Sequence, residues 1–210
     1  MEAAVHMYSS AASWPQLRGL AERLAAKAVI LCDISADRPF DEAHSHSWSQ
    51  VERFLIGQGV EPERGVASCT VELRGLADVT PRLAEADAAA FYDYLVSMGV
   101  VAPAENHAPI SCTPVSPTSL QAVEMVTTPR TGVCVHCKDV GDQVSRGDVV
   151  ARVFDPTEAD PDRAWVLLKA TNEGIIFARW HQRVVRAGMA VSKIAGKDDG
   201  SLSADARLLD

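Results

Sequence analysis

The stretch ASCTVEL, residues 67–73, decides the expected fold, because it combines a strand pattern with a carboxylate near its end. Its small and β-branched residues, between Gly65 and Gly75, predict a strand that is buried on both faces. A carboxylate is almost never fully buried unless it is paired, binds a metal or takes part in chemistry. Two interpretations of Glu72 are therefore open: an ion pair with Arg74 or another arginine, or a functional carboxylate.

Helix and strand patterns alternate around this stretch, over residues 1–102. Ser13 and Gln16 have the spacing of a capping box, which predicts a helix start before the apolar spacing of WPQLRGLAERLAAK (14–27). The apolar run AVILCDI (28–34) predicts a second buried strand, and apolar spacing predicts further helices around 48–55 and over 80–99. This order predicts a parallel or mixed α/β sheet, although two clear strands leave its edges open.

The second half of the chain has a different pattern. Residues 103–122 are rich in proline and predict a linker, residues 123–196 predict an all-β module, and residues 197–210 form a polar tail. Within the module, VSRGDVVARV (144–153) aligns without gaps on VRAGMAVSKI (185–194). We therefore expect a small pseudo-symmetric sandwich, with the glycines at turn positions of positive φ and the valines in the core.

Composition and charge limit the partners. The formal net charge of −8 argues against nucleic acid or an anionic membrane, because both require a basic surface. No signal-peptide pattern or membrane-length apolar run is present in the sequence. Five scattered cysteines are typical of reduced thiols in the cytoplasm, and the C-x-x-C pair, Cys134 and Cys137, lies in a predicted strand.

Several segments in a fixed order resemble one known family. They are TVELRG (70–75), SMGVV (97–101), TGVCVHCKDVGDQVSRGDVVARVFDP (131–156), NEGIIFARWHQRVVRAGMAV (172–191), EAAVHMYSSAASW (2–14) and FDEAHSHSW (40–48). Over residues 2–195 the chain resembles the C-terminal two-thirds of the succinylglutamate desuccinylase and aspartoacylase family, and especially its bacterial N-acyl amino acid deacylases. The resemblance implies an α/β fold class, with a partial carboxypeptidase-like mixed sheet followed by a small all-β barrel-sandwich module.

The resemblance also implies a role for Glu72. The family's glutamate in this position is the general base, which takes a proton from zinc-bound water and returns it to the leaving amine. His6 and Arg74 are the expected substrate-binding neighbours. The family's zinc ligands correspond to positions upstream of Met1, so zinc is expected of the complete enzyme and no metal ligand is located in this chain.

Other histidines provide no clear substitute for those ligands. The H-x-H of His44 and His46 could form a metal pair on a strand, but a helix is expected to begin there and no third ligand lies nearby.

The expected function is therefore zinc-dependent hydrolysis of the amide bond of a small N-acyl amino acid in the cytoplasm. The alternative is a non-catalytic fragment, or a binding or assembly subunit, that requires a partner chain. A homo-oligomer or a complementing N-terminal chain is the expected assembly, and neither nucleic acid nor a membrane is an expected partner.

Overall fold

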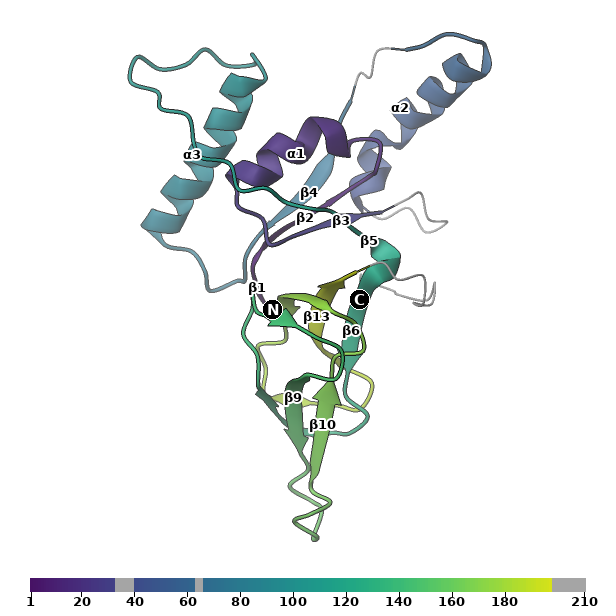
Figure 1. Ribbon diagram of the computed structural model, residues 1–210, viewed down its shortest axis with the longest axis vertical. Coiled ribbons are helices and arrows are strands. Elements are labelled where there is room, and N and C mark those ends of the chain that lie inside the picture. The colour runs from purple at the N-terminus through teal and green to yellow at the C-terminus, as the bar shows by residue number, and fades with distance from the viewer. Residues whose placement is uncertain (33–39, 63–65, 198–210) are drawn as a thin grey trace.

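The computed structural model of the chain describes residues 1–32, 40–62 and 66–197, without the side chains of residues 40–45 (Figure 1). Two helices cover one face of a mixed sheet, and the β module lies against the other face (Figure 1). Residues 198–210 of the expected tail, 197–210, and the end of the AVILCDI stretch, 33–34, lie outside the described residues. In the described part of the chain, no helix is long and apolar enough to cross a membrane.

The mixed sheet has four strands in the order β4-β2-β3-β5. These strands are β2 (Val5–Ser9), β3 (Ala28–Leu31), β4 (Cys69–Leu73) and β5 (Thr118–Ser119). β2 runs parallel to β3 and antiparallel to β4, and β5 lies within the expected linker. The expectation that ASCTVEL is buried on both faces is wrong, because β4 is an edge strand whose last two residues, Glu72 and Leu73, are exposed.

The three predicted helices are present, as α1 (Trp14–Arg23), α2 (Phe40–Gly57) and α3 (Pro81–Ser97), with a short 3-10 helix, η1 (Leu120–Ala122). The Thr80 hydroxyl caps α3 by accepting a hydrogen bond from the Leu83 N–H, and Gly99 follows the helix at φ +71°. The predicted capping box of α1 is wrong. Ser13 is itself in a helical conformation, and its side chain makes no capping bond.

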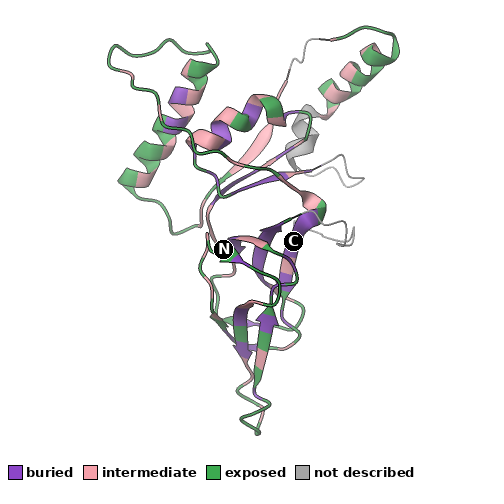
Figure 2. Ribbon diagram, in the orientation of Figure 1, coloured by how far each residue is buried: buried purple, intermediate pink, exposed green. Residues whose placement is uncertain are grey.

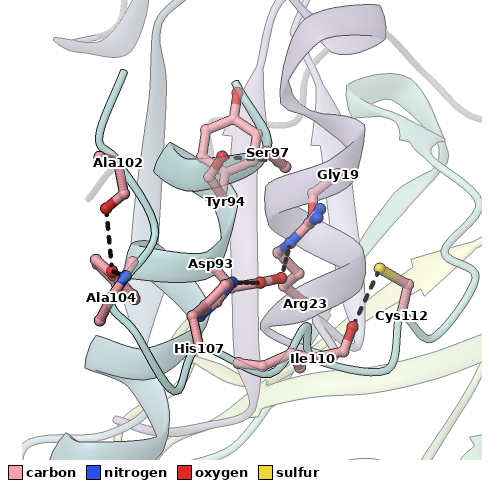
Figure 3. Close-up of polar contacts among 11 residues, drawn as sticks. Gly19, Arg23, Asp93, Tyr94, Ser97, Ala102, Ala104, His107, Ile110 and Cys112 are labelled. Atoms are coloured by element: carbon pink, nitrogen blue, oxygen red, sulfur yellow. Dashed lines mark hydrogen bonds and ion pairs between the residues drawn. The ribbon is translucent and has the colours of Figure 1, made fainter. Parts of the chain in front are cut away.

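The helices α1 and α3 pack on the sheet through one apolar core. The buried members of this core are Val5, Met7, Leu17, Leu20, Ala21, Leu24, Ala26, Val29 and Ala90. A buried ionic network fastens the same helices together, because Asp93 of α3 accepts a 2.6 Å hydrogen bond from Arg23 Nε and lies 2.8 Å from His107 Nε2 (Figure 3). His107 thereby holds the segment after α3 against the helices.

The β module consists of two sheets that share a core. Their strands are β1 (Glu2–Ala3), β6 (Val123–Thr127), β7 (Gly132–His136), β8 (Gln143–Val144), β9 (Val149–Phe154), β10 (Trp165–Lys169), β11 (Gly174–Arg179), β12 (Val184–Val185) and β13 (Ala190–Gly196). One sheet has the order β1-β11-β13-β6 with β8 beside β11, and the other has the order β10-β9-β7-β12. The described residues form no closed barrel, so the module is a pair of packed sheets.

The predicted repeat is present in the core of this module. Val144, Val150 and Val153 are buried together with their counterparts at positions 185, 191 and 194, which are valine, valine and isoleucine. Gly147 and Gly188 occupy matching turns at φ +92° and +86°. The N–H of Gly147 donates to Ala170 O at 2.8 Å and that of Gly188 donates to Thr128 O at 2.7 Å. Each of these turns is therefore bonded to the residue that follows a strand outside its own copy, β10 for Gly147 and β6 for Gly188.

The face of the mixed sheet away from the helices packs against the β1-β11-β13-β6 sheet. Buried residues of this junction include Ala28, Ile30, Val123, Phe177 and Ala195. The chain itself crosses the junction at its start, because β1 pairs with β11 and the next strand, β2, belongs to the mixed sheet.

Candidate functional site

The expected site residues His6 and Glu72 meet at this junction. They are directly opposite one another in the antiparallel pairing of β2 and β4. Directly opposed residues project from the same face of a sheet, with Cβ atoms roughly 5 Å apart. The structure therefore brings together two of the three residues that the sequence pointed to.

His6 is buried, with 3% of its surface exposed. Its Nδ1 lies 2.8 Å from the carbonyl oxygen of Ala4, which requires that Nδ1 carry the proton and donate. The ring packs against Phe177 of β11, with centroids 4.9 Å apart. Burial lowers the pKa of His6, while the Ala4 hydrogen bond and the charge of Glu72 oppose that shift. A neutral His6 with a fixed ring orientation follows from these contacts.

Glu72 is exposed at the open edge of the sheet. In the part of the chain that the structure describes, its carboxylate makes no hydrogen bond or ion pair. The interpretation of Glu72 as a glutamate paired with Arg74 is therefore wrong. A carboxylate that is fixed by a strand but has free oxygens is able to accept a proton from a molecule bound beside it.

Lys193 is a further ionisable group near Glu72, and the sequence analysis missed it. It lies on β13, is 9% exposed, and has its pKa lowered by burial against an opposing effect of the Glu72 charge. Lys193 occupies a position of the VRAGMAVSKI repeat, where the apolar neighbours predict a strand and nothing marks the lysine as buried. The burial of Lys193 can be recognised only once the two sheets are packed together.

Arg74 lies after the end of β4, at φ +90°, and its guanidinium is bound by α3. Its two terminal nitrogens donate to the two carboxylate oxygens of Asp87 at 2.7 and 2.8 Å. This hydrogen bond is the largest cause that raises the pKa of Arg74. The bidentate geometry is the one a guanidinium uses for any carboxylate, and here Asp87 provides that carboxylate.

Two other buried carboxylates have structural partners. The carboxylate of Glu124 accepts hydrogen bonds from the backbone N–H groups of Thr171 and Asn172 at 2.9–3.0 Å, and so holds the turn between β10 and β11. Asp93 belongs to the network with Arg23 and His107 (Figure 3). Glu72 is distinguished from both by its unbound oxygens.

The described residues do not fit a zinc site. Among them, no group of three or more histidine, cysteine, aspartate or glutamate side chains could hold a metal ion. His44 and His46 are two residues apart on the helix α2, where such residues do not share a face, and the side chain of His44 is outside the description. Cys134 is buried, which raises its pKa, whereas Cys137 is exposed, and both are free thiols.

Comparisons with known proteins agree on the fold. The sequence gives no match to protein-family models or to curated proteins. Solved structures do match. A protein described as a succinylglutamate desuccinylase/aspartoacylase from Shewanella frigidimarina NCIMB 400 superposes with a TM-score of 0.79 at 18% identity, over 93% of this chain and 50% of its own. A family protein from Shewanella amazonensis SB2B gives a TM-score of 0.78 at 18% identity, over 92% and 51% of the two chains.

A third match is the ectoine utilization protein EutE (DoeB) from Ruegeria pomeroyi, with a TM-score of 0.62 at 16% identity, over 93% of this chain and 56% of its own. The chain thus spans about half the length of the structures that it matches, a smaller share than the two-thirds that the resemblance implied. The chain therefore has the fold of the succinylglutamate desuccinylase/aspartoacylase family, over about half the length of a family protein.

Proposed function

We propose that this chain is part of a deacylase that hydrolyses the amide bond of a small N-acyl amino acid, with Glu72 as its general base. The observation that carries the proposal is the position of Glu72, which lies opposite the buried His6 near the end of a strand and whose carboxylate has no hydrogen-bond or ion-pair partner among the described residues. The fold is shared with structures described as desuccinylases and aspartoacylases, which supports this reaction class.

The chemistry assigned to Glu72 is proton transfer. Its carboxylate accepts a proton from the attacking water as the new carbon–oxygen bond forms at the acyl carbon. It returns that proton to the nitrogen when the carbon–nitrogen bond breaks, so the products are a carboxylate and a free amino acid. A positioned general base of this kind contributes a factor of roughly 10² to 10⁴ in rate.

The neighbouring groups have supporting roles in the proposal. A neutral His6, held by Ala4, supplies a polar ring beside the base without adding charge. Lys193 lies near enough to Glu72 for the two charges to attract one another. Arg74 remains a candidate for binding a substrate carboxylate, for which it would have to leave Asp87.

Zinc remains an expectation for the complete enzyme. Because the described residues do not offer a set of ligands, no step is assigned to the metal. We propose that its ligands belong to the part of the family fold that this chain does not span. Five free cysteines favour a reducing compartment, which is consistent with a reaction in the cytoplasm.

The test uses N-succinyl and N-acetyl amino acids with acidic, basic and neutral side chains as substrates. The chain is mixed with a polypeptide that supplies the missing half of the fold, and the released amino acid and acyl carboxylate are both measured by mass spectrometry in water enriched in ¹⁸O. The proposal predicts one labelled oxygen in the released acyl carboxylate. A complex that forms but hydrolyses none of these substrates would contradict it and favour a non-catalytic binding role.

A further inference from the structure

One face of the β module is apolar and exposed. It belongs to the sheet β10-β9-β7-β12, whose other face contributes Val150, Val153 and Val185 to the module core. Along β10, exposed residues alternate with less exposed ones (Figure 2). We call the exposed side of this sheet the outer face of the module. Its apolar side chains are Val133, Val135, Phe154, Trp165, Leu167 and Val184.

The pairing of the strands arranges the outer face in two rows. The first row, in order across the four strands, consists of Trp165, Phe154, Val133 and Val184. The second row consists of Leu167, Arg152 and Val135. Directly opposed residues project from the same face of a sheet, with Cβ atoms roughly 5 Å apart. The apolar side chains therefore form one continuous surface with an arginine in it.

The side chains of this surface are those that dominate protein interfaces. Trp165 is 44% exposed, Leu167 is 52% exposed and Val184 is 69% exposed. The guanidinium carbon of Arg152 lies 5.4 Å from the centre of the Trp165 ring, which in turn lies 5.0 Å from that of Phe154. Contiguous exposed apolar patches mark interaction sites, and tryptophan and arginine are enriched among the residues that contribute most to binding. The outer face is therefore suited to bind another protein surface.

The charges around the outer face identify that surface. In the described strands β7, β9, β10 and β12, the only residues with a permanent charge are the cations Arg152 and Lys169, and both are exposed. The turn that joins β9 to β10, residues 155–164, has the opposite charge, because it contains one arginine and four carboxylates, those of Asp155, Glu158, Asp160 and Asp162. The chain thus carries a cationic face and, beside it, an anionic turn.

Half of the turn's carboxylates are available to a second molecule. Arg130 lies 4.0 Å from Asp155 and 3.9 Å from Glu158, and so offsets their charge within one copy. Asp160 and Asp162 form no ion pair with the described residues and are exposed. The turn lies at the end of the molecule away from the mixed sheet, where a second copy can approach it (Figure 1).

A contact between two identical copies uses this complementarity twice, because a two-fold axis gives each copy the same surface. An axis that runs across the strands, between two outer faces, reverses the strand direction of one copy relative to the other. The turn lies on one side of the row that contains Trp165, and Arg152 and Lys169 lie on the other side. An axis near that row therefore places the turn of each copy over the cations of its partner. We infer that the outer face is a contact between two copies of this chain.

This contact is independent of the proposed function. The junction that contains His6 and Glu72 is formed by the other sheet of the module, β1-β11-β13-β6. The outer face is on the opposite side of the module, so dimerisation neither requires nor reports the activity of Glu72.

The test measures the mass of the purified 210-residue chain by sedimentation equilibrium at concentrations from roughly 1 to 300 µM, which cover weak interfaces. The apolar variant combines Trp165→Lys and Leu167→Glu. The face variant is Arg152→Glu, the turn variant combines Asp160→Lys and Asp162→Lys, and a further variant combines the face and turn changes. The control is Trp48→Lys, because Trp48 is an exposed tryptophan on α2, outside the outer face.

We expect a dimer of the wild-type chain and an equal dimer of the control. The dissociation constant should rise roughly 100-fold in the apolar variant, as for central residues of an interface. It should rise roughly tenfold in the face variant and in the turn variant, because each reversed charge occurs twice in the contact.

The combined variant distinguishes a lost contact from a damaged fold. Its cations are on the turn and its carboxylate is on the face, so it should dimerise more tightly than either single variant. A wild-type chain that stays monomeric at every concentration overturns the inference. A dimer that survives in the apolar variant, that the control dissociates, or that the combined variant does not regain overturns it as well.

Discussion

His6 and Glu72 are directly opposite one another on β2 and β4, yet the histidine is buried and the glutamate is exposed. The difference follows from the order of the sheet. β2 has neighbours on both sides and the β module over one face, whereas β4 is paired on one side only among the strands that the structure describes. The His6 side of the candidate site is therefore enclosed by the described chain, whereas the Glu72 side is exposed at the edge of the sheet.

The burial of His6 predicts a pH dependence of stability. Its pKa in the folded chain is lowered from the ordinary value of 6.5, so below that pH the unfolded chain binds more protons than the folded one. The free energy of unfolding should therefore fall as the pH falls through the window below about 6.5, by at most about 1.4 kcal/mol per pH unit for this group. Chemical unfolding at several pH values between 5 and 8 measures the slope of the free energy of unfolding against pH.

The variant His6→Asn should reduce that slope while its amide retains the hydrogen bond to Ala4. Some slope should remain, because burial also lowers the pKa of His136. The control is His181→Asn, at an exposed position. An unchanged slope in His6→Asn would mean that folding does not shift the pKa of His6, and would contradict the lowered pKa of the buried ring.

Arg74 has two possible roles, structural support and substrate binding, and kinetics separates them. Replacing it by lysine removes the bidentate contact with Asp87, which should destabilise the chain by about 1–2 kcal/mol because both groups are largely screened from water. If Arg74 also binds a substrate carboxylate, Arg74→Lys should raise the KM of the assembled enzyme about tenfold, whereas Asp87→Asn should not. Equal KM values in all three proteins would leave Arg74 with its structural role alone.

Gly132 and Gly174 occupy equivalent positions in the two halves of the β module. A Cβ on either would overlap a backbone carbonyl oxygen of the facing strand, that of Phe154 or that of Ala195. Gly132→Ala and Gly174→Ala should each destabilise the chain by about 1–3 kcal/mol or more, because a backbone cannot yield as a side chain can. Gly57→Ala is the control, because that site has open space. Thermal unfolding measures all three, and a neutral Gly132→Ala would contradict the packing described.

The Asp93 network predicts a difference between buried and exposed ion pairs. Asp93→Asn leaves the guanidinium of Arg23 without its charged partner between α1 and α3. Its loss of stability should clearly exceed that of Glu22→Gln, which removes an exposed pair with Arg18 that contributes about 0–1 kcal/mol. Urea unfolding of both variants measures the difference, and equal losses would contradict a structural role for the network.

The sequence predicted most of the elements because their patterns are local. Helical spacing and the Thr80 cap marked α3, and the aligned valines and glycines marked the repeat before any strand was placed. Family resemblance singled out Glu72 and His6, which the structure then placed side by side.

The rest depends on contacts between distant segments. The short strand VHMYS (5–9) has no clear alternation, and only its pairing with two distant strands shows that it is central. The exposure of Glu72 depends on its edge position, and the burial of Lys193 depends on how two sheets pack. Ser13 has the spacing of a cap, but its neighbour Ser10 engages its hydroxyl instead. None of these outcomes is encoded in the local pattern.

The most direct test of the account is the hydrolysis rate of the assembled two-part enzyme when Glu72 is replaced by glutamine. Glu72→Gln keeps the size and removes the proton acceptor, and Glu85→Gln, at an exposed position on α3, is the control. The account predicts that kcat falls by a factor of at least roughly 100 in Glu72→Gln and stays unchanged in the control, with affinity between the two polypeptides preserved in both. Equal rates in wild type and Glu72→Gln would contradict the assignment of Glu72 as the general base.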